Sequence, residues 1–149
     1  MLVRLLYASR AADNVSQEEL LKILSQSKSN NPESGITGVL CSSGRIFLQV
    51  LEGGRMQVNG LYNQIAADPR HKDVVILSYE EISERKFSCW SMGQVNLERI
   101  NPSLLLKYSE CATLDPYSVS GKASMALFDE LMATASIMGQ ASASPSAAR

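Results

Sequence analysis

The sequence predicts an α+β fold, a ferredoxin-like βαββαββ sheet with two helices on one face and C-terminal helices packed on the other. Short apolar runs bounded by glycine, proline or serine are typical of strands. Two longer segments between them repeat apolar residues at helical spacing. With 149 residues and 45% apolar side chains, the chain suits one domain with an extension.

The first strand is expected at residues 2–9, which are mostly apolar. The sequence 16–19 (Ser-Gln-Glu-Glu) has the form of a capping box, and apolar residues at helical spacing follow it. The first helix is therefore expected at about residues 17–29. Pro32 and Gly35 are expected to end it and turn the chain.

The next elements form a hairpin and a second helix. Strands are expected at 36–42 and 45–52, joined by the turn signal Ser43-Gly44. A helix is expected at about 55–67, because apolar residues there recur at helical spacing until Asp68-Pro69 stops it.

Two further strands are expected at 74–81 and 90–97. Beyond residue 100, Asn101-Pro102 favours a short leucine-bearing helix, and a longer helix is expected after residues 118–121. Its apolar side would consist of Met125, Phe128, Leu131, Met132 and Ala135. These helices are expected to cover the open face of the sheet.

The chain is therefore divided into three expected parts. Residues 1–97 would form the main domain and residues 98–138 a helical extension. Residues 139–149 have no periodicity and little apolar bulk, so a flexible tail is expected.

Composition excludes several classes of function. The net charge is −1, with 14 basic and 15 acidic side chains, so nothing favours binding to nucleic acid or to an anionic membrane. The apolar runs are too short to span a bilayer, and a cytoplasmic location is expected. Three widely spaced cysteines and one histidine do not supply a structural metal site.

Gln49 is the most informative residue, because it lies in an otherwise apolar run that reads as a strand buried on both faces. An unsatisfied buried amide would cost roughly 1–3 kcal/mol. Tyr7 lies in a similar run near the start of the chain. The first and third strands are neighbours at the centre of this topology, so Tyr7 and Gln49 can meet on the helix-covered face. From the pattern alone, they could simply satisfy each other in the core.

Two further polar clusters stand out. Ser27, Asn30 and Asn31 lie within one helical turn, although an Asn-Asn pair before proline is also an ordinary helix ending. Trp90 and Met92 flank a serine, and strand alternation would put both on the same face. Either side chain could also be simple core.

Taken in order, these motifs and residues 35–38 (Gly-Ile-Thr-Gly) resemble the BLUF domain, a blue-light sensor that holds a flavin non-covalently. The resemblance covers about the first 95 residues. It implies a flavin ring between the two helices, with its N5 and O4 edge bonded to Gln49 and lying beside Tyr7. It also implies that Asn31 contacts the ring, with Ser27 and Asn30 as neighbouring polar positions.

The resemblance assigns further roles. Asp68 and Arg70 match the stretch near the ribityl chain and phosphate, where Arg70 could hold the phosphate, although a solvated polar loop is an equal alternative. Trp90 and Met92 match the signalling segment, in which either residue can lie beside the glutamine. FAD is the implied cofactor, and FMN stays possible.

The implied mechanism is photochemical, so the protein is expected not to be an enzyme. Light would draw an electron and, through Gln49, a proton from Tyr7. Gln49 would return in a new orientation or tautomer, and the absorption would move slightly to the red. The signal would pass through the C-terminal helices to a separate partner protein, with assembly into a homo-oligomer also expected.

Three rival functions remain. One is an acylphosphatase-like hydrolase using Arg10 and Asn31, although no glycine-rich anion cradle follows the first strand. Another is a ligand-free interaction module in which Tyr7 and Gln49 are structural. A flavin-dependent reductase would need room for a nicotinamide and a substrate, which so small a domain hardly provides.

Overall fold

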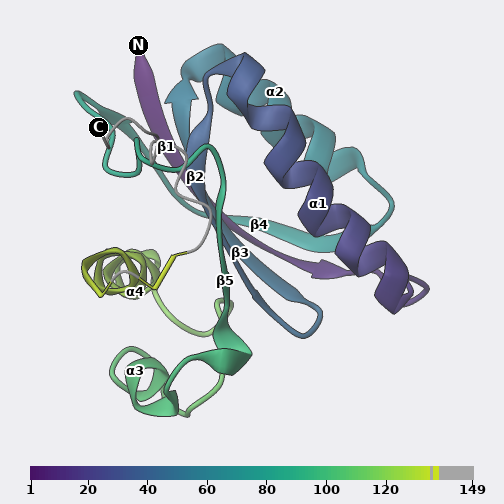
Figure 1. The fold of residues 1–149 in the computed structure, drawn as a ribbon, viewed down its shortest axis with the longest axis vertical. Coiled ribbons are helices and arrows are strands. Elements are labelled where there is room, and N and C mark those ends of the chain that lie inside the picture. Colours follow the sequence, from purple (N-terminus) through teal and green to yellow (C-terminus); the bar gives the residue numbers. More distant parts are fainter. Residues whose placement is uncertain (135, 138–149) are drawn as a thin grey trace, which may run out of the picture.

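The computed structural model describes residues 1–134 and 136–137, with residues 28–32 described by their backbone alone. One five-stranded sheet carries helices on both faces (Figure 1). The elements in chain order are β1 (Leu2–Ala11), α1 (Gln17–Ser34), β2 (Thr37–Ser43), β3 (Ile46–Gly54), α2 (Arg55–Ala67), β4 (His71–Ile82), β5 (Gly93–Asn96), η1 (Leu97–Arg99), α3 (Pro102–Leu106) and α4 (Gly121–Ala133).

The strand order is β4-β1-β3-β2-β5, which confirms that the first and third strands are central neighbours. Strands β1 and β3 run antiparallel, and their register places Tyr7 directly opposite Gln49. Strand β5 lies parallel to β2 at one edge. The register therefore brings together the two polar residues that the sequence singled out.

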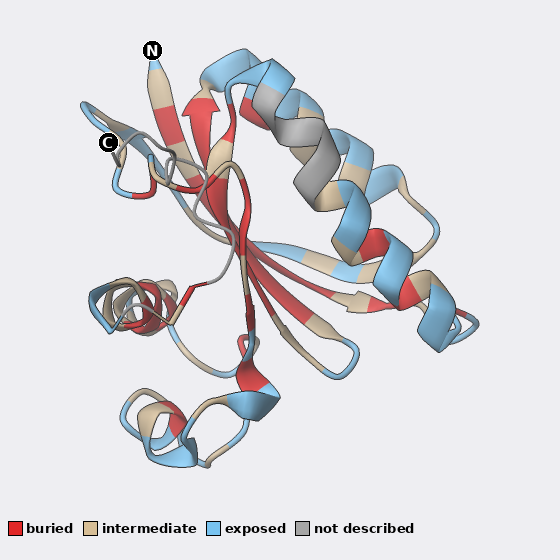
Figure 2. Cartoon of the chain, viewed as in Figure 1, coloured by how far each residue is buried: buried red, intermediate tan, exposed pale blue. Residues whose placement is uncertain are grey.

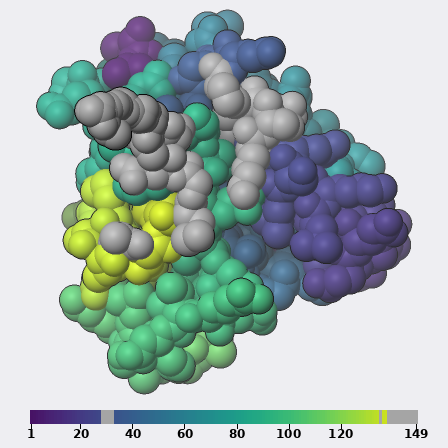
Figure 3. Space-filling view, viewed as in Figure 1, coloured from purple at the N-terminus to yellow at the C-terminus, as the bar shows by residue number. Residues whose placement is uncertain are grey.

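The sheet separates two cores, as the burial pattern shows (Figure 2). One core lies under α1 and α2 and includes the alternating β1 residues Val3, Leu5 and Tyr7. The other lies under α3 and α4 and includes Leu127 and Phe128. Figure 3 shows the first part of α1 (purple) and α4 (yellow) on opposite sides of the molecule. The predicted fold class is confirmed.

Helix α1 begins as predicted but ends later. Ser16 Oγ accepts from the Glu19 backbone N–H at 3.2 Å, and Glu19 Oε1 accepts from the Ser16 N–H at 3.2 Å, which is a complete capping box. The helix continues to Ser34 rather than 29, so the predicted stop at Pro32 is wrong. Gly35, with φ of +75°, follows Ser34 and ends the helix.

The predicted fifth strand at 90–97 is too long, because β5 contains only Gly93–Asn96. Trp90 and Met92 lie in the connection before it, where strand alternation does not apply. Trp90 joins the core under the C-terminal helices, and Met92 joins the core under α1 and α2. The expectation that both share one face is therefore wrong. Trp90 packs with Phe87, at a centroid distance of 6.4 Å, and its backbone oxygen accepts from Gly38 N–H.

The C-terminal helices form as predicted, each with a side-chain cap. Asn101 accepts from the Ser103 N–H and starts α3, and Ser120 accepts from the Ala123 N–H and starts α4. Phe128 and Leu131 are buried on the predicted apolar side of α4. Ala135 and the predicted tail, 139–149, lie outside the described residues.

Within the described part of the chain, every helix is too short or too polar to cross a membrane. The same residues contain no group of three or more His, Cys, Asp or Glu placed to hold a metal ion.

Gly38 should be required for the β2–β3 pairing, because an added Cβ would lie 2.0 Å from the Val50 carbonyl oxygen. We expect Gly38→Ala to lower the free energy of unfolding by about 3 kcal/mol. The matched control is Gly60→Ala, in α2, where an added Cβ meets nothing within 4 Å. That change should raise stability by roughly 0.5–1 kcal/mol. Urea unfolding measures the free energy of unfolding of both variants. Equal changes in the two would contradict the role assigned to Gly38 in the β2–β3 pairing.

Candidate functional site

Tyr7 and Gln49 form a buried hydrogen-bonded pair at the sheet centre. The Tyr7 hydroxyl donates to Gln49 Oε1, and Gln49 Nε2 donates to Met92 Sδ at 3.2 Å. Tyr7 is 2% exposed and Gln49 3%. A thioether sulfur can only accept, so this arrangement places the amide oxygen toward the phenol. The three side chains therefore form one chain from β1 through β3 to the segment before β5.

Burial raises the pKa of the Tyr7 phenol above its ordinary value, and the nearby Tyr62 raises it further. The Tyr62 ring packs edge-on against the Tyr7 ring, with centroids 5.7 Å apart. Tyr7 therefore keeps its proton in the resting protein and presents it to Gln49. The sulfur on the other side of the amide is a weak acceptor, so the amide is held firmly only by the phenol.

A cavity of about 670 Å³, including its solvent-open part, lies beside this pair. Helices α1 and α2 form two of its walls and the sheet forms its floor. The lining residues are Tyr7, Ile23, Gln26, Ser27, Leu40, Phe47, Gln49, Leu61, Gln64, Ile65, Asp68, Arg70 and His71.

A charged pair lines the same cavity after α2. Arg70 donates through Nε and a terminal nitrogen to Asp68 at 2.6–3.1 Å, and also to Gln26 Oε1 at 2.8 Å. The hydrogen bond from Arg70 lowers the pKa of Asp68, and the same bond raises the pKa of Arg70. Asp68 thereby orients a permanent cation that could meet an anionic ligand group.

His71 lies next to this pair, at the start of β4. Its Nδ1 lies 3.2 Å from Ser9 Oγ, and its ring tilts against Phe47 with centroids 5.6 Å apart. Burial is the main cause that lowers the pKa of His71, against an opposing effect of Asp68. The imidazole is therefore neutral at pH 7.

Ser27 lines the cavity and also connects α1 to β5. Its hydroxyl donates to the Leu24 carbonyl at 2.9 Å, and Gln94 Nε2 donates to that carbonyl at 2.8 Å and to Ser27 Oγ at 3.3 Å. The side chains of Asn30 and Asn31 lie outside the described residues. Their predicted roles stay predictions.

The structure separates Trp90 from the other predicted site residues. Met92 contacts Gln49, whereas Trp90 lies in the opposite core with its Nε1 buried and unpartnered in the described chain. Arg10, proposed for the hydrolase, lies 3.7 Å from Asp73 and stacks over Tyr117, away from the cavity residues. Nothing in its contacts forms an anion cradle.

Sequence reasoning missed three glutamines, Gln26, Gln64 and Gln94. Gln64 follows Leu61 by three residues, so helical spacing could have placed it on the cavity side of α2. Gln26 adjoins Ser27, whose position had been singled out. Gln94 gave no signal, because its role depends on β5 lying beside β2 and near α1.

The donor set suits a flat heteroaromatic ligand with an amide-like edge and a phosphate. Gln49 contributes a neutral amide to the cavity lining, apolar side chains such as Ile23 and Leu61 form much of the rest, and Arg70 contributes a cation. The fold and site thus define a small α+β domain with a ligand-binding cavity between two helices and the sheet.

The sequence matches the BLUF family, described as sensors of blue-light using FAD, over residues 2–93. The chain therefore belongs to the BLUF family of flavin-binding blue-light sensors. It is 34% identical over 87 residues to the blue light- and temperature-regulated antirepressor BluF of Escherichia coli, covering 58% of this chain and 22% of that protein. It is 40% identical over 86 residues to the photoactivated adenylate cyclase subunit alpha of Euglena gracilis, covering 58% of this chain and 8% of that protein.

Shorter solved proteins match over almost their whole length. The photo-activated state of BlsA superposes with a TM-score of 0.77 at 31% identity, covering 89% of this chain and 95% of that one. The dark-state structure of BlrB, a BLUF protein, gives 0.71 at 32% identity, with 90% and 96% covered. The chain thus spans less than a quarter of these two curated relatives but nearly all of these stand-alone domains.

His71 should make stability depend on pH, because it is the only histidine and its pKa is lowered by folding. The unfolded state then binds a proton more readily, so stability is complete above the unfolded pKa of about 6.5 and falls as pH decreases toward the folded value. NMR titration of the single imidazole should give a pKa below 6.5. Urea unfolding of His71→Gln should lose this pH dependence between pH 5 and 7. An imidazole titrating above 6.5 would contradict the burial argument.

Proposed function

We propose that this chain senses blue light through FAD held in the cavity between α1 and α2, and that it is not an enzyme. The observation that supports this most is the buried chain Tyr7–Gln49–Met92 at one end of that cavity. A phenol proton, a rotatable amide and a soft sulfur are the parts that a reversible hydrogen-bond switch needs. A hydrolase would need a nucleophile or an anion cradle instead.

The proposed flavin contacts combine the cavity lining with the residues that the family resemblance singles out. FAD is favoured because the family description specifies it, while a BlrP1 structure from Klebsiella pneumoniae contains FMN. Arg70 lines the cavity, is held there by its bonds to Asp68, and would hold the phosphate, which supports either cofactor. The proposed contacts are Tyr7, Ser27, Asn30, Asn31, Gln49, Asp68, Arg70 and Met92.

When bound, the flavin supplies blue-light absorption and, once excited, a strong pull on a nearby electron. The part of the response that the protein itself supplies involves Tyr7 and Gln49. Tyr7 would give up an electron to the excited flavin, and its hydroxyl proton would move to Gln49 Oε1, to which it is already hydrogen-bonded. When the electron and the proton return to the phenol, the amide would stand in a new orientation or tautomer. In a dry site, such a change alters hydrogen-bond energies strongly.

We propose that Met92 transmits the change in Gln49 to the rest of the protein. Its sulfur accepts from Gln49 Nε2 in the described structure, so a turned amide would present an oxygen to an atom that cannot donate. Met92 directly precedes β5, which leads into η1 and the C-terminal helices. We propose that residues 98–138 form the output segment, with 139–149 as its tail. Trp90 is proposed as a second relay residue.

A separate downstream protein is proposed as the receiver of the signal. The E. coli relative is called an antirepressor and the Euglena relatives are cyclase subunits, so those proteins couple the domain to different outputs. Self-association of this chain is proposed as well. Size-exclusion chromatography with light scattering, in dark and light, measures the oligomer size.

Tyr7→Phe should keep the bound flavin but abolish the light-induced red shift, because the phenol proton that Gln49 accepts is gone. Difference absorption spectra of dark and illuminated protein measure this. The matched control is Tyr62→Phe, which removes a hydroxyl beside the same ring stack without touching Gln49. The control should retain the shift. A normal shift in Tyr7→Phe would refute the proposed role.

Arg70→Met should weaken flavin binding, because a charge-assisted bond to phosphate contributes roughly 1.5–3 kcal/mol, or about a tenfold to hundredfold change in Kd. Fluorescence titration of the flavin-free protein with FAD, FMN and riboflavin measures it. Riboflavin lacks the phosphate, so its affinity should not change. An equal loss for all three ligands would show that Arg70 does not act on the phosphate.

A further inference from the structure

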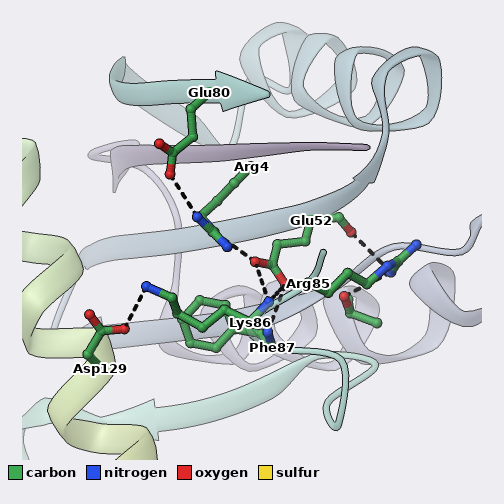
Figure 4. Close-up of polar contacts among 8 residues, drawn as sticks. Arg4, Glu52, Glu80, Arg85, Lys86, Phe87 and Asp129 are labelled. Carbon is green, nitrogen blue, oxygen red and sulfur yellow. Dashed lines mark hydrogen bonds and ion pairs between the residues drawn. The ribbon is translucent and has the colours of Figure 1, made fainter. Parts of the chain in front are cut away.

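Glu52 is a fully buried carboxylate on β3, three residues beyond Gln49. Side chains alternate along a strand, so Glu52 faces the C-terminal side of the sheet while Gln49 faces the cavity. Its oxygens accept from Arg4 Nε at 2.7 Å, from Lys86 N–H at 3.0 and 3.1 Å, and from Phe87 N–H at 2.8 Å (Figure 4). A sheet residue thus holds the backbone of the β4–β5 connection.

The charge on Glu52 explains why this hold is specific. A buried carboxylate is costly unless it is paired and hydrogen-bonded. Arg4 and the two N–H groups together satisfy both oxygens. A glutamine would fit the same space, but its NH₂ group is a donor. It would point at another donor, either Arg4 or a backbone N–H, where the carboxylate oxygen accepts a hydrogen bond. The negative charge, and not the shape, is therefore what fixes residues 86 and 87.

Glu52 also belongs to a polar row that crosses the sheet. Arg4 lies opposite Glu52 on β3 and opposite Glu80 on β4, and donates to Glu80 at 2.7 Å. On the other side, Thr37 of β2 pairs with Glu52, and its hydroxyl accepts from Arg85 at 2.9 Å. The connection is therefore attached to the sheet through three consecutive residues, 85–87.

The same connection contacts α4. Lys86 Nζ lies 3.1 Å from Asp129 Oδ1, and the Phe87 ring packs edge-on against Phe128 with centroids 6.0 Å apart. Figure 4 shows the Lys86 side chain reaching Asp129, while the backbone of Lys86 and Phe87 reaches Glu52. The two residues whose backbone Glu52 holds are thus the two whose side chains contact α4.

We propose that Glu52 is a positioning residue that couples the light-sensing side of the sheet to α4. It fixes residues 86–87 relative to the strand that carries Gln49, so that a shift of Met92, five residues further along the connection, is transmitted to α4. This inference rests on the proposed function, since it concerns the output of the same photochemical site. Without the carboxylate, residues 86–87 are no longer held in place relative to β3, so their contacts with α4 no longer follow a change at Gln49.

The test separates the optical response from the response at α4. Full-length protein with bound flavin is measured in dark and light by absorption and by amide hydrogen exchange over 121–133. Glu52→Gln should keep the red shift, while the light-dark difference in exchange at α4 falls about threefold or more. The matched control is Glu81→Gln on β4, an exposed glutamate whose ion pair is with Arg55. It should retain both responses.

A charge swap tests the same path without disturbing the buried site. Lys86→Glu should reduce the exchange difference at α4, and Lys86→Glu with Asp129→Lys should restore it. This pair decides the question if Glu52→Gln does not fold. A wild-type exchange response at α4 in folded Glu52→Gln, or in Lys86→Glu, would overturn the proposal. Absence of any red shift in the unmodified protein would instead contradict the proposed function.

Discussion

The structure depends on the satisfaction of one buried amide. Gln49 lies in the central strand, where a lost partner would cost roughly 1–3 kcal/mol. Tyr7 supplies a strong donor on one side and Met92 a weak acceptor on the other. The amide oxygen therefore has a strong partner in Tyr7, whereas the amide nitrogen has only a weak one in Met92. A cavity that opens beside it then adds a third set of possible partners, and the choice among them can become a signal.

The sheet separates the cavity under α1 and α2 from the core under α3 and α4, and its strands contribute residues to both. Alternation along β3 directs Gln49 to the cavity under α1 and α2, and Glu52 to the core under α4. The connection before β5 contributes to both sides, since Met92 lies in one core and Trp90 in the other. A displacement of this one segment is thus felt in both cores without any rearrangement of the sheet.

Much of this was accessible from the sequence, because its signals are local. The capping box at Ser16 and the alternation in the first and third strands predicted α1 and the Tyr7–Gln49 contact. The position of Trp90 was not predictable, because it follows from tertiary packing against Phe87 in an irregular segment. The anchoring role proposed for Glu52 was hidden likewise, since its partners are Arg4, 48 residues away, and backbone groups about 34 residues away. The later end of α1, at Ser34, could not be predicted from Pro32, because the helix ends only at the positive φ of Gly35.

The most direct test of the account is the absorption spectrum of purified, flavin-reconstituted protein before and after blue illumination. The protein should be yellow, with flavin bands that move slightly to longer wavelength in the light and return fully in the dark. Protein that stays colourless after reconstitution, or whose bands do not move under illumination, would contradict the claim that Gln49 exchanges hydrogen-bond partners beside a bound flavin.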